Sequence, residues 1–231
     1  MKKLFVANYK MNGDKNFYQK VNKEINKLDL KDTVVLCPPF VYMPFLQLKN
    51  ENVLLGAQDV CAVEDKKSTG QINSTMLKEF GLNYCIVGHS ERRAIGESDE
   101  IVANKVFALL EKGITPIVCV GEKTKRSGLS VLQKQVKSAL SKAKSKSKIV
   151  FAYEPVWAIG TGEQPTVEKI NEALTIVKTI AKECGFKVQV LYGGSVNGSN
   201  IKEVSSSVAD GFLMGGVSLK LDEFIGIVKG E

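Results

Sequence analysis

Short apolar runs alternate along the chain with longer segments in which apolar residues recur every three or four positions. The runs are mostly β-branched or aliphatic and lack the strict alternation of a half-exposed antiparallel strand. They therefore predict strands of a parallel sheet that is covered on its faces. The eight runs are Leu4–Ala7, Thr33–Cys37, Val53–Ala57, Tyr84–Val87, Ile114–Val120, Ile149–Tyr153, Lys187–Tyr192 and Val208–Leu213.

The segments between these runs have the spacing of amphipathic helices. The clearest stripes are Phe17–Val21–Ile25–Leu28, Val102–Val106–Leu109, Val167–Ile170–Leu174–Val177–Ile180 and Leu221–Phe224–Ile225–Val228. Ser98 is a suitable N-cap for the helix that continues through Asp99 and Glu100. Gly81, Gly113 and Gly185 follow helical stretches, where a left-handed residue commonly ends a helix.

Strand followed by helix, eight times and without a break in composition, predicts a (β/α)₈ barrel formed by residues 1–231 as a single domain. Such a barrel needs about 250 residues, so most loops must be short. An open doubly wound sheet is the alternative, but no GxGxxG motif follows the first strand. One connection, residues 58–73, is long and polar, as expected for a lid, an insertion or a subunit contact.

The composition is that of an ordinary globular protein, with 44% hydrophobic and 25% charged residues. No apolar run approaches the ~18 residues of a membrane span, and the N-terminal run is too short for a signal peptide. We therefore expect a cytoplasmic protein. Five dispersed cysteines and a single histidine give no metal-type spacing, so we expect reduced thiols and no metal site.

The positive charge is concentrated in one place. The formal net charge is +7, and residues 123–148 contain nine Lys or Arg and no acid. Because these residues surround an apolar stripe of Leu132, Val136 and Leu140 and include no aromatic residue, we interpret them as a solvated helix face. Binding to nucleic acid or anionic lipid is the alternative.

Candidate functional residues follow several of the predicted strands. In a parallel barrel the active site lies at the carboxyl ends of the strands. The residues placed there are Asn8 and Lys10, His89, Glu154, Gly193–Gly194–Ser195, and Gly215–Gly216. Each alone has an ordinary structural explanation, because a histidine at a strand end is usually structural and glycine pairs are mostly turns. Their joint occurrence at one rim favours an active site.

Glu154 lies in the segment Phe151–Gly162, FAYEPVWAIGTG. A carboxylate at a strand end, followed by a stiff proline and a glycine-containing tail, predicts a catalytic acid or base beside a lid at Pro155–Thr161. The turns YGGS and MGGVS lie at strand-to-helix junctions, where backbone N–H groups can bind a phosphate. Gly160 on the lid is a third source of such donors.

The motifs NYKMN, VGHSERR, CVGE, AYEPVWAIGTG, YGGSV and GFLMGGVSL occur in the order and spacing of the triosephosphate isomerase family, which the whole chain resembles. The resemblance implies Glu154 as base, His89 as a neutral electrophile and Lys10 as the cation near the substrate. It implies that Asn8 orients the site and that Glu91 supports Lys10 or relays protons. Substrate binding is expected at Asn8, Lys10, Gly160, Ser195, Leu213, Gly215 and Gly216.

The resemblance also implies the reaction, which interconverts dihydroxyacetone phosphate and D-glyceraldehyde 3-phosphate through an enediolate, with no metal or organic cofactor. It implies a homodimer in which the loop 58–73 docks into a second subunit with Thr69 at its tip. Gln71 and the run Lys66–Lys67–Ser68 depart from the family pattern in this loop.

Two other functions explain part of the pattern. A different barrel enzyme for a phosphorylated substrate, such as a sugar-phosphate aldolase or an aminated-sugar isomerase, would also need the glycine turns. An aldolase requires a desolvated Schiff-base lysine, and no predicted strand has a lysine at its centre. A polyanion-binding protein would use residues 123–148 instead.

Overall fold

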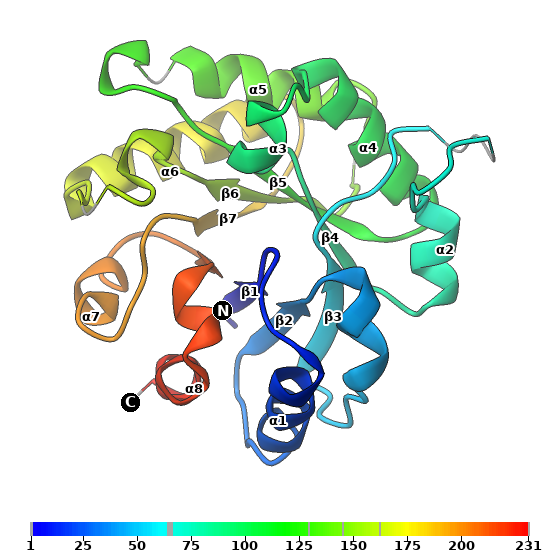
Figure 1. The fold of residues 1–231 in the computed structure, drawn as a ribbon. Coiled ribbons are helices and arrows are strands. Elements are labelled where there is room, and N and C mark those ends of the chain that lie inside the picture. The colour runs from blue at the N-terminus through cyan, green and yellow to red at the C-terminus, as the bar shows by residue number, and fades with distance from the viewer. Residues whose placement is uncertain (1, 64–66, 129, 145, 162, 231) are drawn as a thin grey trace.

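Eight parallel strands, taken in chain order, close on themselves as a barrel in the computed structural model (Figure 1). The structure describes residues 2–63, 67–128, 130–144, 146–161 and 163–230. The strands are β1 (Leu4–Asn8), β2 (Thr33–Cys37), β3 (Val53–Ala57), β4 (Tyr84–Val87), β5 (Thr115–Val120), β6 (Val150–Tyr153), β7 (Gln189–Tyr192) and β8 (Gly211–Met214). Because β8 pairs with β1, the predicted barrel is confirmed and the open sheet is excluded.

Helices surround the barrel as an outer ring (Figure 1). They are α1 (Lys15–Ile25), α2 (Ser74–Glu79), α3 (Ser90–Ala94), α4 (Asp99–Glu111), α5 (Ser130–Leu140), α6 (Val167–Glu183), α7 (Ile201–Val204) and α8 (Leu221–Lys229). Short 3₁₀ helices lie at η1 (Phe40–Phe45), η2 (Lys125–Ser127), η3 (Val156–Ala158) and η4 (Gly216–Leu219). The Ser98 hydroxyl caps α4 as expected, accepting the Ile101 N–H at 3.2 Å.

The strands are apolar except at a few terminal positions, because both of their faces are buried. Alternate side chains, such as Val6 and Leu213, fill the barrel interior, while their neighbours Phe5 and Phe212 pack outward against the helices. Successive side chains of a strand therefore point alternately into and out of the barrel, and both sets are apolar. This explains why the runs were visible in the sequence as strands.

The last strand differs from its prediction. It begins at Gly211, whereas the apolar run begins at Val208, whose side chain is 50% exposed. Asp210 fixes this start, since its carboxylate accepts the Val190 N–H at 2.8 Å and its carbonyl accepts the Leu4 N–H at 3.0 Å. A polar anchor, rather than the apolar run, sets the beginning of β8.

Residues 123–148 include α5, which buries its apolar stripe at Leu132, Val136 and Leu140, as predicted. Several of the lysines pair with acids from other segments. Lys144 lies 2.9 Å from Glu111, Lys134 lies 3.8 Å from Asp99, and Lys125 pairs with Glu163. These pairs reduce the local positive charge on this face.

Among the helices of the described residues, none has the length and apolarity needed to cross a membrane.

Candidate active site

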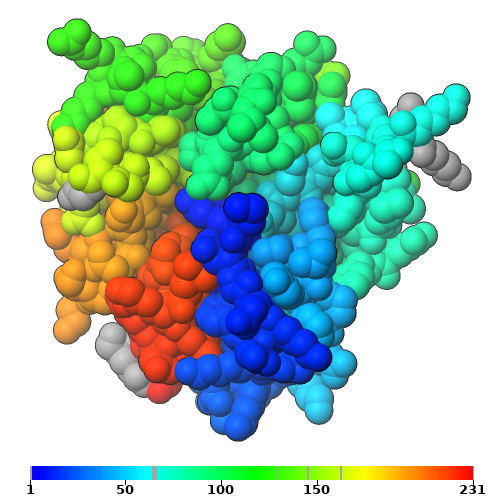
Figure 2. Space-filling view, in the orientation of Figure 1, coloured from blue at the N-terminus to red at the C-terminus, as the bar shows by residue number. Residues whose placement is uncertain are grey.

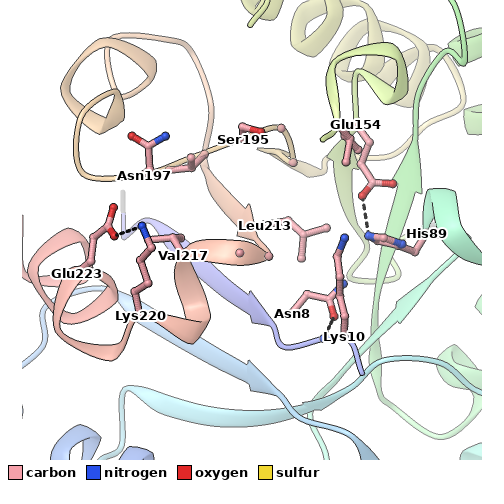
Figure 3. Close-up of a pocket in the computed structure, with 16 residues that line it drawn as sticks. Asn8, Lys10, His89, Glu154, Ser195, Asn197, Leu213, Val217, Lys220 and Glu223 are labelled. Atoms are coloured by element: carbon pink, nitrogen blue, oxygen red, sulfur yellow. Dashed lines mark hydrogen bonds and ion pairs between the residues drawn. The ribbon is translucent and has the colours of Figure 1, made fainter. Parts of the chain in front are cut away.

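A pocket of about 350 Å³ opens at the carboxyl rim of the barrel (Figure 3). It is lined by residues at or just after the carboxyl ends of β1, β4, β6, β7 and β8. Those that the sequence singled out are Asn8, Lys10, His89, Glu154, Gly193, Gly194, Ser195, Leu213, Gly215 and Gly216. The fold therefore brings ten candidate residues from five strand ends into one cavity. Glu91 borders the site through contacts described below, and Gly160 does not line it.

Glu154 follows β6 and is 2% exposed. One carboxylate oxygen lies 3.0 Å from Nε2 of His89, and the other accepts the Ser90 N–H at 3.0 Å. The backbone of Glu154 packs directly against Gly121, since a Cβ at Gly121 would lie 1.7 Å from the Glu154 carbonyl oxygen. Only glycine permits this close approach of the ends of β5 and β6. The approach fixes the position from which the Glu154 side chain enters the pocket.

His89 is the N-cap residue of α3, and its geometry identifies the tautomer. Its Nδ1 accepts the Glu91 N–H at 3.2 Å. Because a backbone N–H can only donate, Nδ1 carries no proton and the ring proton lies on Nε2, which points at Glu154. The ring is therefore neutral and presents an N–H donor to the pocket (Figure 3).

Lys10 reaches the pocket from an unusual backbone conformation, with φ of 51°. For a residue other than glycine this left-handed conformation costs of order 1 kcal/mol or more, so surrounding contacts must hold it. Asn8 Oδ1 accepts the Lys10 N–H at 3.0 Å, and Gln58 Nε2 donates to the Lys10 carbonyl at 2.8 Å. Gln58 was missed in the sequence, because nothing local marks a contact 48 residues away.

The Lys10 ammonium lies 2.8 Å from a carboxylate oxygen of Glu91. Partial burial raises the pKa of the Glu91 carboxyl, but the hydrogen bond and charge of Lys10 outweigh it, so this pKa lies below its usual value. Glu91 is therefore ionised beside Lys10 and fixes the ammonium next to His89.

The glycine turns after β7 and β8 complete the lining of the pocket. Gly194 is required there, since a Cβ would lie 2.1 Å from the Tyr192 hydroxyl oxygen. The Ser195 carbonyl accepts hydrogen bonds from Asn200 Nδ2 at 2.8 Å and Gln164 Nε2 at 3.2 Å. After β8, Gly216 begins η4. Because glycines at both turns carry no side chain, an anion can come close to the backbone N–H groups there.

The predicted lid begins at Pro155 and is tied to the barrel by Glu122, which is 5% exposed. One Glu122 oxygen accepts both the Trp157 indole N–H at 2.7 Å and the Tyr153 hydroxyl at 2.8 Å. Ile159 lines the pocket, whereas Gly160 is exposed and is not among the residues that line it. Gly162 lies outside the described residues.

A rim pocket with a buried carboxylate, a neutral imidazole donor and open glycine turns is typical of (β/α)₈-barrel enzymes that move protons on small phosphorylated substrates. Comparison with known proteins identifies one family within this class. The chain belongs to the triosephosphate isomerase family, whose family model matches residues 3–231.

Curated relatives agree with this assignment. The chain is 38% identical to the triosephosphate isomerase of Clostridium botulinum (strain Loch Maree / Type A3), covering 98% of each protein. It is 40% identical to that of Aquifex aeolicus (strain VF5), covering 99% of each, and 42% identical to that of Thermoanaerobacter sp. (strain X514), covering 87% of each. The resemblance found in the sequence motifs is confirmed.

Proposed function

We propose that this protein interconverts dihydroxyacetone phosphate and D-glyceraldehyde 3-phosphate through an enediolate, as a step of glycolysis and gluconeogenesis. Family membership supports the reaction, and one observation carries the chemistry. The Glu154 carboxylate and the protonated Nε2 of a neutral His89 lie 3.0 Å apart in the rim pocket. A base and a hydrogen-bond donor are thereby paired at the distance that proton transfer requires.

In this mechanism Glu154 removes a proton from the carbon next to the substrate carbonyl. The electron pair moves onto the carbonyl oxygen, and the His89 Nε2–H and the Lys10 ammonium stabilise the negative charge that develops there. A proton then passes from the hydroxyl on the deprotonated carbon to the former carbonyl oxygen. Glu154 returns its proton to the carbon that carried the carbonyl, so the carbonyl is re-formed on the neighbouring carbon. Asn8 and Glu91 hold Lys10 in place, and the substrate oxygens take over the Nε2–H that otherwise faces Glu154.

The phosphate would bind to backbone N–H groups of Ser195, Gly215 and Gly216, with Leu213 forming the apolar floor. An enediolate phosphate exposed to water can lose its phosphate group, so the lid must exclude water during the reaction. Closure would add Gly160 to the donors.

The direct test is a coupled assay of triose phosphate interconversion on Glu154→Gln. The amide keeps the size of the side chain and an acceptor for the Ser90 N–H, but it is not a base. We expect kcat to fall by about 10²–10⁴-fold, the usual contribution of a positioned base. Glu183→Gln, at an exposed site on α6, is the matched control and should have wild-type activity. Equal activity in both variants would exclude Glu154 as the base.

We further propose a homodimer. Large apolar side chains are exposed at Met11 (95%), Val41 (74%) and Ile95 (73%). They follow β1, β2 and β4, which are near neighbours in the barrel, so they lie on one side of the molecule. The described residues of the 58–73 segment, which include the exposed Thr69, follow β3 and project from the edge of the molecule near β4 (Figures 1 and 2). Exposed apolar surface of this kind is typical of a subunit interface. Residues 64–66 lie outside the described residues.

We also propose that residues 1–231 act as one catalytic domain in the cytoplasm and use no cofactor. The five cysteines are all free thiols, which fits a reducing compartment. Nucleic acid is not a proposed partner, since the lysines of residues 123–148 are partly paired with acids.

A further inference from the structure

The two glycine turns belong to strands that the barrel joins less firmly than the others. The pairing of β7 with β8 has one residue pair in register, Tyr192 with Phe212. The pairings on either side, β6 with β7 and β8 with β1, each have four. Sheet hydrogen bonding therefore does little to fix the distance between the turn after β7 and the turn after β8.

Glu223, in the first turn of α8, supplies a connection outside the sheet. One of its oxygens accepts the N–H of Gly198, in the segment after β7, at 2.7 Å. Its other oxygen pairs with Lys220, just before α8, at 3.2 Å. Among the hydrogen bonds and ion pairs of the described residues, the Gly198–Glu223 bond is the one that joins residues 193–200 to residues 215–224.

The charge state of Glu223 suits this role. The Gly198 N–H lowers the pKa of the Glu223 carboxyl, burial opposes this, and Lys220 lowers the pKa further, so that it lies below its usual value. An ionised acceptor makes a shorter and stronger bond to a backbone N–H than a neutral one. The position in the first turn of α8 also suits a negative charge.

The location of Glu223 is otherwise unexpected. It lines the same pocket as Ser195 and Gly216, at the end opposite Glu154 and His89 and near Asn197 (Figure 3). A carboxylate at the phosphate end of a pocket repels an anionic ligand, so its presence there requires a separate explanation. Lys220 neutralises the charge of Glu223, and the hydrogen bond to Gly198 gives Glu223 a structural role at this position.

We propose that Glu223 is a positioning residue for the phosphate: it holds the turn after β7 and the turn after β8 at the spacing at which both donate N–H groups to one dianion. The inference rests on the proposed function only in taking a phosphate group as the ligand of this end of the pocket. Glu223 itself acts through Gly198 and does not contact the substrate.

The test is calorimetric titration of the full-length protein with inorganic phosphate, which requires no turnover. Glu223→Ala removes the bond, and we expect it to weaken phosphate binding about tenfold, since small displacements of aligned groups have effects of this size or larger. Glu223→Gln keeps an oxygen that can accept the Gly198 N–H, so its affinity should stay within about threefold of wild type. Asp222→Asn removes the same charge from the same helical turn without removing the bond, so it should bind no more weakly than wild type.

Urea unfolding of each variant establishes that the proteins compared are folded. A purely electrostatic role predicts the opposite sign, because loss of a negative charge should tighten binding of an anion in Glu223→Ala as in Asp222→Asn. Affinity of Glu223→Ala equal to or tighter than that of Asp222→Asn would overturn the inference, and so would a wild-type protein that binds no phosphate.

Failure of the proposed function is separately visible. A wild-type protein without isomerase activity, but with phosphate affinity that depends on Glu223, would overturn the reaction and retain the positioning role. If the wild-type protein is an active isomerase and Glu223→Ala changes neither phosphate affinity nor KM, the positioning role is overturned and the reaction is retained.

Discussion

At the scale of single residues, the site depends on which atoms carry protons. His89 donates through Nε2 because its Nδ1 is occupied by the Glu91 N–H, an arrangement that the start of α3 imposes. A neutral imidazole can donate to a carbonyl oxygen and leave the neighbouring carboxylate free to act as base. The same backbone turn therefore positions the His89 ring and, through the Ser90 N–H, the Glu154 carboxylate.

The tautomer can be measured directly, because His89 is the only histidine of the chain. In protein labelled with ¹⁵N-histidine, the NMR spectrum at neutral pH should show one protonated ring nitrogen, assigned to Nε2, and one bare nitrogen, assigned to Nδ1. The reason is that the Glu91 N–H excludes a proton from Nδ1. A proton on Nδ1, or on both nitrogens, would contradict the geometry described for the site.

The sequence predicted those residues that stand at strand ends, and it failed for those whose partners are distant. Glu154, His89 and Lys10 each follow an apolar run, so the fold rule places them at the rim. Gln58 and Glu223 act through backbone atoms 48 and 25 positions away, and no local pattern records such contacts. Glu122 lay within a recognised motif, yet its bonds to Trp157 and Tyr153 appear only once the barrel closes.

At the scale of elements, the strand ends set the geometry of the site. β5 and β6 approach closely at Gly121, and Glu154 leaves β6 from that contact. The boundaries of β1 to β4 were predicted nearly to the residue, because both faces of these strands are buried. The start of β8 was not, because Asp210 anchors it through hydrogen bonds that the apolar pattern does not encode.

Two glycine-to-alanine substitutions should have opposite effects on stability. Gly121→Ala places a methyl group against the Glu154 carbonyl, which must shift, so we expect a loss of about 2 kcal/mol or more in the free energy of unfolding and a lower kcat. Gly226→Ala, inside α8, meets no atom within 4 Å and should stabilise by about 0.5–1 kcal/mol. Urea unfolding measures both, and a neutral Gly121→Ala would refute the close-packing argument.

At the scale of the whole molecule, the exposed apolar surface is uneven. Of the large apolar side chains that are exposed among the described residues, all but Val208 lie in segments that follow β1 to β4, and the β1 segment also carries Lys10, next to Met11. Pairing of two subunits over this surface would therefore bury a loop that holds a site residue. Oligomerisation and activity are coupled in this arrangement.

Met11→Glu should shift the proposed dimer toward monomer and lower activity, because a buried charge without a partner opposes association. Sedimentation across a range of protein concentrations measures the shift. Val208→Glu is the matched control, since Val208 is also exposed but precedes β8, at the opposite end of the barrel, and should leave the assembly unchanged. A monomeric wild type, or equal effects of the two substitutions, would contradict the proposed interface.

The central claim is that Glu154 carries a carbon-bound proton during the reaction, and exchange with solvent tests it most directly. In D₂O the wild-type protein should place deuterium on the carbon next to the carbonyl, because a proton held on a carboxylate exchanges with solvent, and Glu154→Gln should slow this incorporation about 10²–10⁴-fold. Interconversion without any incorporation, or incorporation by Glu154→Gln at the wild-type rate, would contradict the account.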